Sequence, residues 1–298
     1  MMARAGLALM WLVRWLPGSL LAAVGNLFGS LLYFAASERR HVCLTNLTRC
    51  LPHLDEAQRR ALAKGHFRSL GRSLLERGTL WWSARETIIG RVQLVGLEHL
   101  QEARARGPVI LFAPHFVGLD AGWTRLSFEV DMASVYANQK SAMMNAALHG
   151  GRMRFGKQRL FSRQEGIRPA LAALKAGVPF YYLPDMDYGP RDALFVPFFG
   201  VPAATITGLS RLARLTGARV VPCVARMLSG GCYELRCYPA WDNYPSQHRD
   251  DGNDGADIEA DTRRMNAFIE ERVREMPEQY LWTHKRFKTR PPGEKRWY

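Results

Sequence analysis

Apolar and polar residues occur along most of the chain in blocks that predict strands and helices in turn. Short apolar runs predict strands at residues 92–95, 109–112, 132–136, 178–183, 220–225 and 233–238. Periodic patterns predict helices at residues 119–128, 168–175, 207–216 and 262–276. Strands that alternate with helices in this way favour an α/β fold, in which helices cover the faces of a sheet.

The N-terminal region has a different pattern. Residues 16–36 carry no formal charge, and the run is long enough to cross a bilayer core of about 30 Å. Pro17 and Asn26 weaken it as a spanning helix, so a hairpin or a helix lying in the membrane plane is an alternative. A buried helix of a soluble core is a third interpretation. We expect residues 1–40 to form a membrane anchor and residues 41–298 to form the main domain.

A long amphipathic helix is predicted over residues 54–82, directly after this anchor. Its apolar face carries Leu62, Phe67, Leu70 and Leu74, and basic residues populate the rest. Such a helix either lies on an anionic lipid surface or presents a solvated basic face. The adjacent Trp81 and Trp82 suit either the lipid interface or the protein core.

Composition narrows the class of partner. The chain has 298 residues, of which 47% are hydrophobic, enough for one large core. Lysine and arginine outnumber aspartate and glutamate by 41 to 27, a net charge of +14 that favours an anionic partner: nucleic acid, an anionic membrane or an acidic protein. The five cysteines form no CxxC pair and no zinc pattern, which indicates reduced thiols in a cytosol-facing domain.

Candidate chemistry follows the predicted strand at residues 109–112. His115 comes just after this strand, Asp120 follows in an H-x4-D pattern, and Gly118 lies between them. A strand, a tight turn and a helix would place the imidazole at the strand tip. A neutral histidine can take a proton from a hydroxyl when its other ring nitrogen donates to a partner, and Asp120 is close enough in sequence to be that partner. A buried histidine satisfied by a local carboxylate is the alternative.

Further polar residues lie near other strand ends, where ligands bind in α/β folds. Asp185 and Asp187 follow the predicted strand at residues 178–183 and could bind a metal, pair with arginines or hold the loop. We favour arginine pairing, because no histidine-rich ligand set is nearby. A basic cluster between two strands could bind phosphate or carboxylate groups, or be solvated; it contains Arg152, Arg154, Lys157, Arg159 and Arg163.

Three other segments have distinctive compositions. Residues 195–201, FVPFFGV, are apolar and suit either the wall of an acyl-chain site or the core. Residues 250–261 are acidic and fail the EF-hand spacing, so we expect a solvated loop there. Residues 280–298 are basic, with aromatic residues among the charges.

Taken together, these blocks resemble the late acyltransferases of lipid A biosynthesis, which add secondary acyl chains to Kdo-lipid IVA and belong to the lysophospholipid acyltransferase superfamily. The matching segments run through almost the whole chain in the family's order: RHVCLTNLTRCLP, APHFVGLD, GRMRFGKQRLFSR, LPDMDYGPRDALFVPFFGVPAAT, LSRLARLTGARVVP and RRMNAFIEERVREMPEQYLWTHKRFKTRPPGE. This set is far more specific than the H-x4-D pattern alone.

The resemblance implies a mixed sheet flanked by helices, with residues 41–298 as the acyltransferase domain. It also implies a bacterial inner-membrane enzyme that works on the cytoplasmic face without a cofactor or metal. His115 would be the general base and Asp120 would orient it, although many members carry glutamate at the second position. Substrate binding would fall to Gly118, Arg152, Arg154, Arg163, Asp185 and Asp187. The implied partners are an acyl carrier protein thioester, the lipid A precursor and inner-membrane lipids, with no nucleic acid.

The reaction expected from this resemblance begins when His115 deprotonates the hydroxyl of a 3-hydroxyacyl chain, which then attacks the thioester. Backbone N–H groups at residues 116–118 and a nearby arginine are candidate donors to the oxyanion. One alternative is an acyltransferase for another acceptor, such as a lysophospholipid or an aminolipid. Two others are a membrane-associated nucleic-acid binder, for which no recognition motif is present, and a metal hydrolase built on His115, Asp120, Asp185 and Asp187.

Overall fold

The centre of the molecule is a mixed, seven-stranded sheet, seen in a computed structural model that describes residues 2–246 and 254–298. In sheet order the strands are β1 (Val92–Val95), β9 (Tyr233–Cys237), β8 (Arg219–Met227), β2 (Val109–Phe112), β5 (Phe180–Tyr182), β3 (Ala133–Tyr136) and β4 (Arg159–Ser162). Neighbouring strands are parallel except for β8 and β9, which are antiparallel. The α/β class and the mixed sheet expected from the sequence are therefore confirmed.

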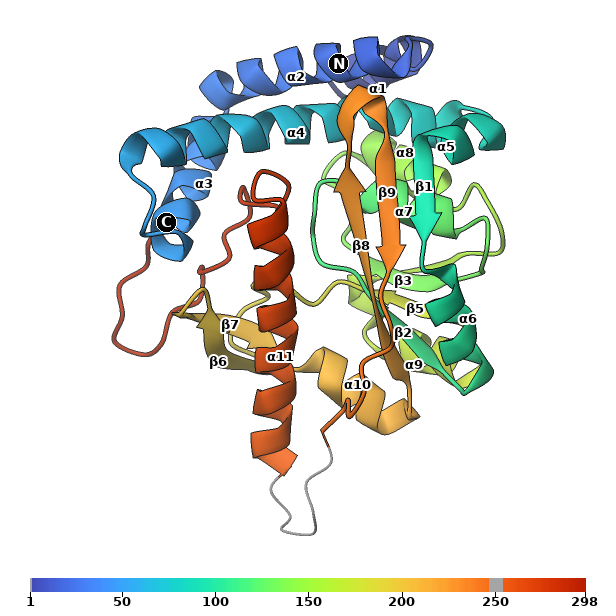
Figure 1. Ribbon diagram of the computed structural model, residues 1–298, viewed down its shortest axis with the longest axis vertical. Coiled ribbons are helices and arrows are strands. Elements are labelled where there is room, and N and C mark those ends of the chain that lie inside the picture. Colours follow the sequence, from blue (N-terminus) through green and yellow to red (C-terminus); the bar gives the residue numbers. More distant parts are fainter. Residues whose placement is uncertain (1, 247–253) are drawn as a thin grey trace.

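Helices cover both faces of this sheet (Figure 1). They are α5 (Arg85–Arg91), α6 (Leu97–Ala105), α7 (Leu119–Leu126), α8 (Ala142–Arg152), α9 (Arg168–Lys175), α10 (Gly208–Thr216) and α11 (Asp254–Glu275). Strand β2 is buried along its whole length and its side chains alternate between two cores. Ile110 and Phe112 belong to the core that contains α9, α10 and α11, whereas Leu111 faces α6 and α7.

Four helices precede the sheet: α1 (Met2–Val13), α2 (Gly18–Ala35), α3 (Ser37–Cys50) and α4 (Glu56–Trp82). Helix α4 begins in a capping box, because the Asp55 side chain accepts from the Gln58 N–H and the Gln58 side chain accepts from the Asp55 N–H. Figure 1 shows α1 and α2 lying along α4 at one end of the molecule. By length and apolar character α2 could cross a membrane.

The acidic stretch expected as a solvated loop is instead helical from residue 254, where α11 begins; residues 250–253 lie outside the described residues. Asp261 is completely buried, and its carboxylate accepts hydrogen bonds from the Ser210 hydroxyl and the Ser246 N–H at 2.5 and 2.9 Å. Sequence composition alone indicated exposure, but these contacts join α11 to α10.

The apolar segment at residues 195–201 contributes to the core. It forms the turn and the adjoining strand residues of a separate hairpin of β6 (Ala193–Phe198) and β7 (Val201–Ile206). Phe198 is fully buried against the rings of Tyr280 and Phe287. Of the two interpretations of this segment, core packing therefore agrees with the structure, and the hairpin holds the C-terminal segment in place.

His66, a fully buried residue of α4, makes the stability of the fold depend on pH. Its Nδ1–H donates to the Glu278 carbonyl at 3.0 Å, and burial lowers its pKa from 6.5 to about 4. The unfolded chain binds a proton here below pH 6.5 and the folded chain does not, so stability present above pH 6.5 is lost as the pH falls to about 4. We expect His66→Gln to remove up to about 3 kcal/mol of this pH-dependent loss.

Chemical unfolding of the detergent-solubilised protein between pH 7 and pH 4 would measure the effect. His53→Gln is a matched control, because His53 is exposed in the turn before α4. Equal pH dependence of the unfolding free energy in His66→Gln and in the parent would contradict the prediction.

Candidate active site

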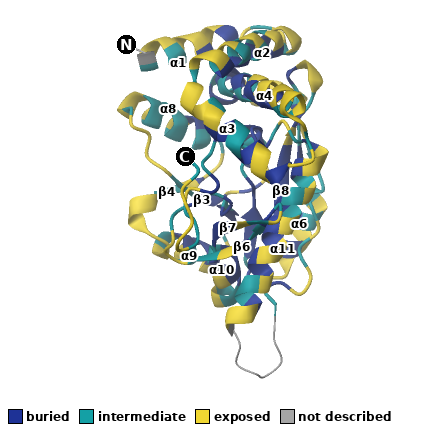
Figure 2. Ribbon diagram, turned by 90° about the vertical axis from the view of Figure 1, so that its left-hand side faces the viewer, coloured by how far each residue is buried: buried dark blue, intermediate teal, exposed yellow. Residues whose placement is uncertain are grey.

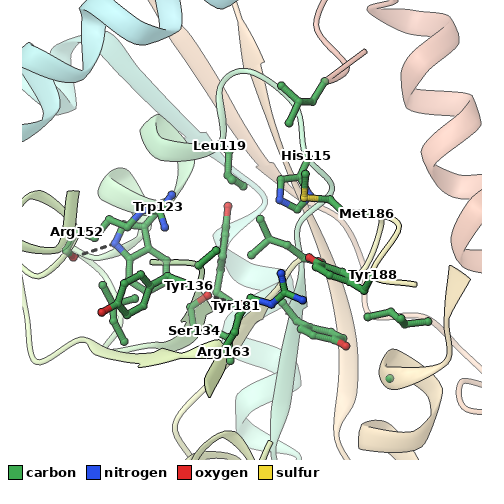
Figure 3. A pocket seen from close by; sticks show the side chains of 18 of the residues that line it. His115, Leu119, Trp123, Ser134, Tyr136, Arg152, Arg163, Tyr181, Met186 and Tyr188 are labelled. Atoms are coloured by element: carbon green, nitrogen blue, oxygen red, sulfur yellow. Dashed lines mark hydrogen bonds between the residues drawn. The ribbon is translucent and has the colours of Figure 1, made fainter. Parts of the chain in front are cut away.

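A cavity of about 790 Å³ lies at the carboxyl ends of the central strands, within the size range of small-ligand sites. Most of its wall is apolar and comes from α4, α7, α8, α9, α10 and β3. Leu70, Trp81, Trp123, Val135, Met144, Leu148, Leu160, Leu171, Met186 and Leu212 are among the lining residues. Figure 3 shows His115 and Met186 on one side of this space and Trp123 and Arg152 on the other.

His115 is positioned by two adjacent parallel strands. It follows β2, and Asp185 follows β5; the register pairs Phe112 of β2 with Tyr182 of β5, so both residues reach the same sheet edge. The His115 Nδ1 lies 2.6 Å from Asp185 Oδ1, and the His115 backbone N–H donates to Asp185 Oδ2 at 2.9 Å. A single carboxylate therefore holds both the ring and the backbone of His115.

This contact determines how the imidazole can react. Because the carboxylate accepts, Nδ1 carries the proton and the lone pair of Nε2 remains available to a substrate in the cavity. The Asp185 carboxylate is 1% exposed. Burial opposes its ionisation, but the attraction of a protonated His115 ring, two hydrogen bonds from His115 and the charge of Arg286 hold the pKa of Asp185 below its usual value. The pair has the geometry of an oriented general base.

The expected contact between Asp120 and His115 is not formed. Asp120 lies in the first turn of α7, where its Oδ1 accepts from Nε and Nη2 of Arg152 at 2.9 and 2.6 Å. Its Oδ2 lies 2.7 Å from Nε of Arg77 on α4. The first turn of α7 presents Asp120 to α4 and α8, and the place at the ring of His115 is taken by Asp185.

Asp120 thus neutralises part of a cationic cluster. Burial would raise the pKa of its carboxyl, but Arg152 and Arg77 hold it well below the usual range. Both guanidinium groups also line the cavity. The cluster places positive charge in the wall that faces the imidazole across the cavity, and the Asp120 carboxylate holds each arginine by an ion pair.

Comparison with known proteins identifies the family of the chain. The family model of bacterial lipid A biosynthesis acyltransferases matches residues 1–289. The chain belongs to this family. It is 33% identical to the lipid A biosynthesis lauroyltransferase of Escherichia coli K12 over 292 residues, covering 97% of this chain and 92% of the relative.

Two further relatives show the same pattern. The palmitoleoyltransferase of E. coli K12 is 31% identical over 98% of this chain and 93% of its own length. The myristoyltransferase of the same organism is 33% identical over 92% of this chain and 82% of its own. The relatives' names give different acyl chains at similar identity, so overall identity does not assign the chain length that this acyltransferase transfers.

Of the other residues expected in the site of the acyltransferase, Arg163 lines the cavity, whereas Arg154 and Gly118 are not among its lining residues. Arg163 is exposed, lines the cavity and lies over the Tyr188 ring, with its guanidinium carbon 4.4 Å from the ring centroid. Arg154 points away: its guanidinium contacts the Leu80 carbonyl at 3.4 Å. Gly118 precedes α7 and permits a close approach, since a Cβ there would lie 2.9 Å from the Ala225 carbonyl oxygen.

Asp187 of the acyltransferase holds the C-terminal segment beside the site. Its carboxylate accepts from the backbone N–H and the hydroxyl of Thr289 at 2.6 and 2.8 Å, and its own N–H donates to His284 Nε2 at 3.1 Å. The same segment reaches the catalytic turn, because the Leu281 N–H donates to the His115 carbonyl at 3.0 Å. Asp187 was expected to bind substrate, but in the structure its bonds are to the protein.

Several residues that line the cavity of the acyltransferase were missed from the sequence. Arg77 extends a stripe of α4 that also includes Leu70, Ser73 and Trp81. A cation at helical spacing within an otherwise buried stripe is a signal that could have identified it. Arg191 and Arg211 are exposed residues that also line the cavity; Arg211 belongs to α10, which Figure 1 shows at the opposite end of the molecule from α4. Nothing in their local sequence distinguishes them from solvated arginines.

Proposed function

We propose that this acyltransferase moves a fatty acyl chain from an acyl carrier protein thioester to a hydroxyl of a 3-hydroxyacyl chain on a lipid A precursor of the Kdo-lipid IVA type. The reaction takes place at the cytoplasmic face of the bacterial inner membrane. The observation that carries the proposal is the His115–Asp185 pair, whose imidazole lines an apolar, arginine-bearing cavity.

The proton route follows from the tautomer of His115. Nε2 removes the proton from the acceptor hydroxyl as the oxygen attacks the thioester carbonyl. Asp185, bonded to Nδ1–H at 2.6 Å, stabilises the imidazolium that forms. When the tetrahedral intermediate collapses, the carbon–sulfur bond breaks, and the leaving thiolate takes the same proton from Nε2. The imidazole is regenerated in its starting tautomer.

Stabilisation of the oxyanion falls mainly to side chains. Two of the backbone donors considered for this role are already used, because the Phe116 N–H donates to the Pro114 carbonyl and the Val117 N–H to the Gln279 carbonyl, both at 2.8 Å. Arg152 and Arg77 line the cavity and are fixed by Asp120. We assign the oxyanion to this arginine pair, since preorganised cations need no reorientation when charge develops.

Recognition of the acceptor uses the exposed arginines that line the cavity. Arg163, Arg191 and Arg211 are exposed and suit the phosphate and carboxylate groups of an anionic glycolipid. The apolar wall of the cavity suits acyl chains. The chemistry of this wall and the family relationship favour an acyltransferase over a nucleic-acid binder or a metal hydrolase. An acceptor such as a lysophospholipid remains the second candidate, because its headgroup is also anionic.

A purified-enzyme assay tests the proposal. With a Kdo-lipid IVA acceptor and acyl carrier protein thioesters, we expect the acceptor mass to increase by one acyl chain. A lysophospholipid and an aminolipid serve as competing acceptors, and an acyl-coenzyme A serves as the competing donor. Mass spectra of lipid A from cells with and without the gene should differ by the same single chain. Transfer only to a phospholipid acceptor would contradict the assignment.

A further inference from the structure

An extensive apolar surface covers the N-terminal helices. It is formed by Leu9, Trp11, Leu12, Trp15, Leu20, Leu27, Leu31 and Phe34, here called the N-terminal apolar face. Trp15 and Phe34 are 68% and 70% exposed. Helix α2 contains no charged residue, and Figure 2 shows exposed segments along α1 and α2 at one end of the molecule. A surface of this kind indicates an interaction with another apolar surface.

The opposite side of α2 is in close contact with α4. Its buried stripe consists of Leu21, Ala22, Gly25, Gly29 and Tyr33 and extends along most of the helix. The contact depends on glycines. A Cβ at Gly71 of α4 would lie 2.4 Å from the Gly29 nitrogen, and one at Gly29 would lie 2.1 Å from the Phe67 carbonyl oxygen. The two backbones therefore touch, and any larger side chain at these positions would separate the helices.

Both ends of α2 are also attached to the main domain. At its start, a Cβ on Gly18 would lie 2.5 Å from the Gly230 carbonyl oxygen, and Arg91 donates to the Leu16 carbonyl at 3.2 Å. Toward its end, Arg68 of α4 donates to the Ser30 hydroxyl at 3.4 Å. Helix α2 is thus part of the same layer as α4 and does not project from the domain.

This attachment is incompatible with an α2 that crosses the bilayer. A spanning α2 would carry α4 with it into the hydrocarbon, including the Arg72–Glu76 pair, whose charged atoms lie 3.1 Å apart under the helix. It would also carry the turn that contains Gly230 and the guanidinium group of Arg91. Charged groups and turn backbone are costly in hydrocarbon. The alternative, release of α2 from α4, would expose the glycine stripe and lose the backbone contact.

We propose that α1 and α2 lie in the plane of the membrane, with the N-terminal apolar face immersed in one leaflet, and that neither helix crosses it. The proposal rests on the membrane location given in the proposed function but not on the acyl-transfer chemistry. It decides between the spanning and in-plane interpretations of residues 16–36.

The surroundings of the face identify its partner as a leaflet that contains anionic phospholipid. Lys64 and Arg68 are exposed along α4 beside α2, Arg39 is exposed at the start of α3, just after α2, and Arg4 is exposed in the first turn of α1. The guanidinium of Arg14 lies 4.1 Å from the centroid of the Trp15 ring, a pairing suited to the headgroup region. An apolar face bordered by cations and tryptophan is typical of helices that lie in a membrane interface.

The topology can be tested with single cysteines. Arg4→Cys and Ser37→Cys place thiols before and after α2, and the reactivity of the parent is the baseline, because four native cysteines are buried and Cys232 is partly buried. Sealed spheroplasts are treated with a membrane-impermeant maleimide before and after permeabilisation. We expect the two cysteines to be labelled to the same extent as each other in sealed spheroplasts, and again after permeabilisation. Labelling of one position and protection of the other in sealed spheroplasts would overturn the proposal. This readout does not depend on acyltransferase activity.

The partner can be tested by co-flotation of the full-length protein with vesicles of phosphatidylglycerol and phosphatidylcholine. We expect the double variant Leu27→Lys, Leu31→Lys to lower the apparent affinity by about tenfold or more, because two side chains lose their burial in lipid. Phe195→Lys is the matched control, because Phe195 is 38% exposed on the β6–β7 hairpin. This variant should bind the vesicles like the parent. Parental binding by the double variant, or equal loss in the control, would contradict the proposal.

Discussion

His115→Ala is expected to lower kcat for acyl transfer by about 10²- to 10⁴-fold, the range associated with a positioned general base. The variant loses the only ring nitrogen that faces the cavity from the His115–Asp185 pair, so the acceptor hydroxyl must react without a base. The KM for the lipid acceptor should change little, because the arginines and the apolar wall that we propose to bind it are untouched. Steady-state kinetics with the acceptor and the carrier-protein thioester measures both parameters.

A matched control removes an imidazole that has no place in the site. His53 is exposed in the turn before α4, and His53→Ala should keep the parental kcat. The thermal midpoint of each variant shows whether the fold is retained, which matters because Asp185 is left buried without its ring partner. A folded His115→Ala enzyme with parental kcat would exclude the proposed mechanism.

Asp185→Asn is expected to lower kcat by roughly 10⁴-fold, by analogy with the loss of the orienting aspartate in catalytic triads. The carboxylate now accepts from both the ring and the backbone N–H of His115. An amide has one acceptor oxygen and no charge, so it cannot satisfy both donors or stabilise the imidazolium. The ¹⁵N spectrum of the imidazole should show loss of the single Nδ1–H tautomer, which a purely structural defect would not produce. Asp242→Asn, at an exposed position, is the control.

Asp120→Asn distinguishes the two carboxylates near His115. Removing its charge leaves Arg77 and Arg152 without their counterion, and we expect the free energy of unfolding to fall by about 1–3 kcal/mol, since both arginines are partly exposed. The imidazole tautomer should stay as in the parent. A change of tautomer in Asp120→Asn, with none in Asp185→Asn, would assign the orienting role to Asp120.

The strands around the site were predictable because they are buried on both faces. The runs at residues 109–112 and 178–183 are continuous and apolar, as expected for inner strands of a largely parallel sheet. The positions of His115 and Asp185 after two of these strands were also visible. The order of strands was not, and it is the adjacency of β2 and β5 that brings the two side chains together.

The partner of Asp120 shows why proximity along the chain was misleading. Asp120 and His115 are close in sequence, but α7 turns the carboxylate toward Arg77, which belongs to a helix much earlier in the chain. The sequence could not predict which side of α2 is covered, for a similar reason. An apolar run does not reveal its partner, and the contact with α4 depends on Gly25, Gly29 and Gly71 meeting in space.

The bonds made by the C-terminal segment have a consequence for the order in which the site is assembled during synthesis. Residues 279–281 bond to the turn that carries His115, and Thr289 holds the loop that carries Asp187. A chain still being translated lacks these bonds until residues 279–289 leave the ribosome, whereas α1 and α2 emerge much earlier. Synthesis therefore exposes the N-terminal apolar face long before the turn that carries His115 can be braced, so a nascent chain would have its proposed membrane contact before it has a finished site.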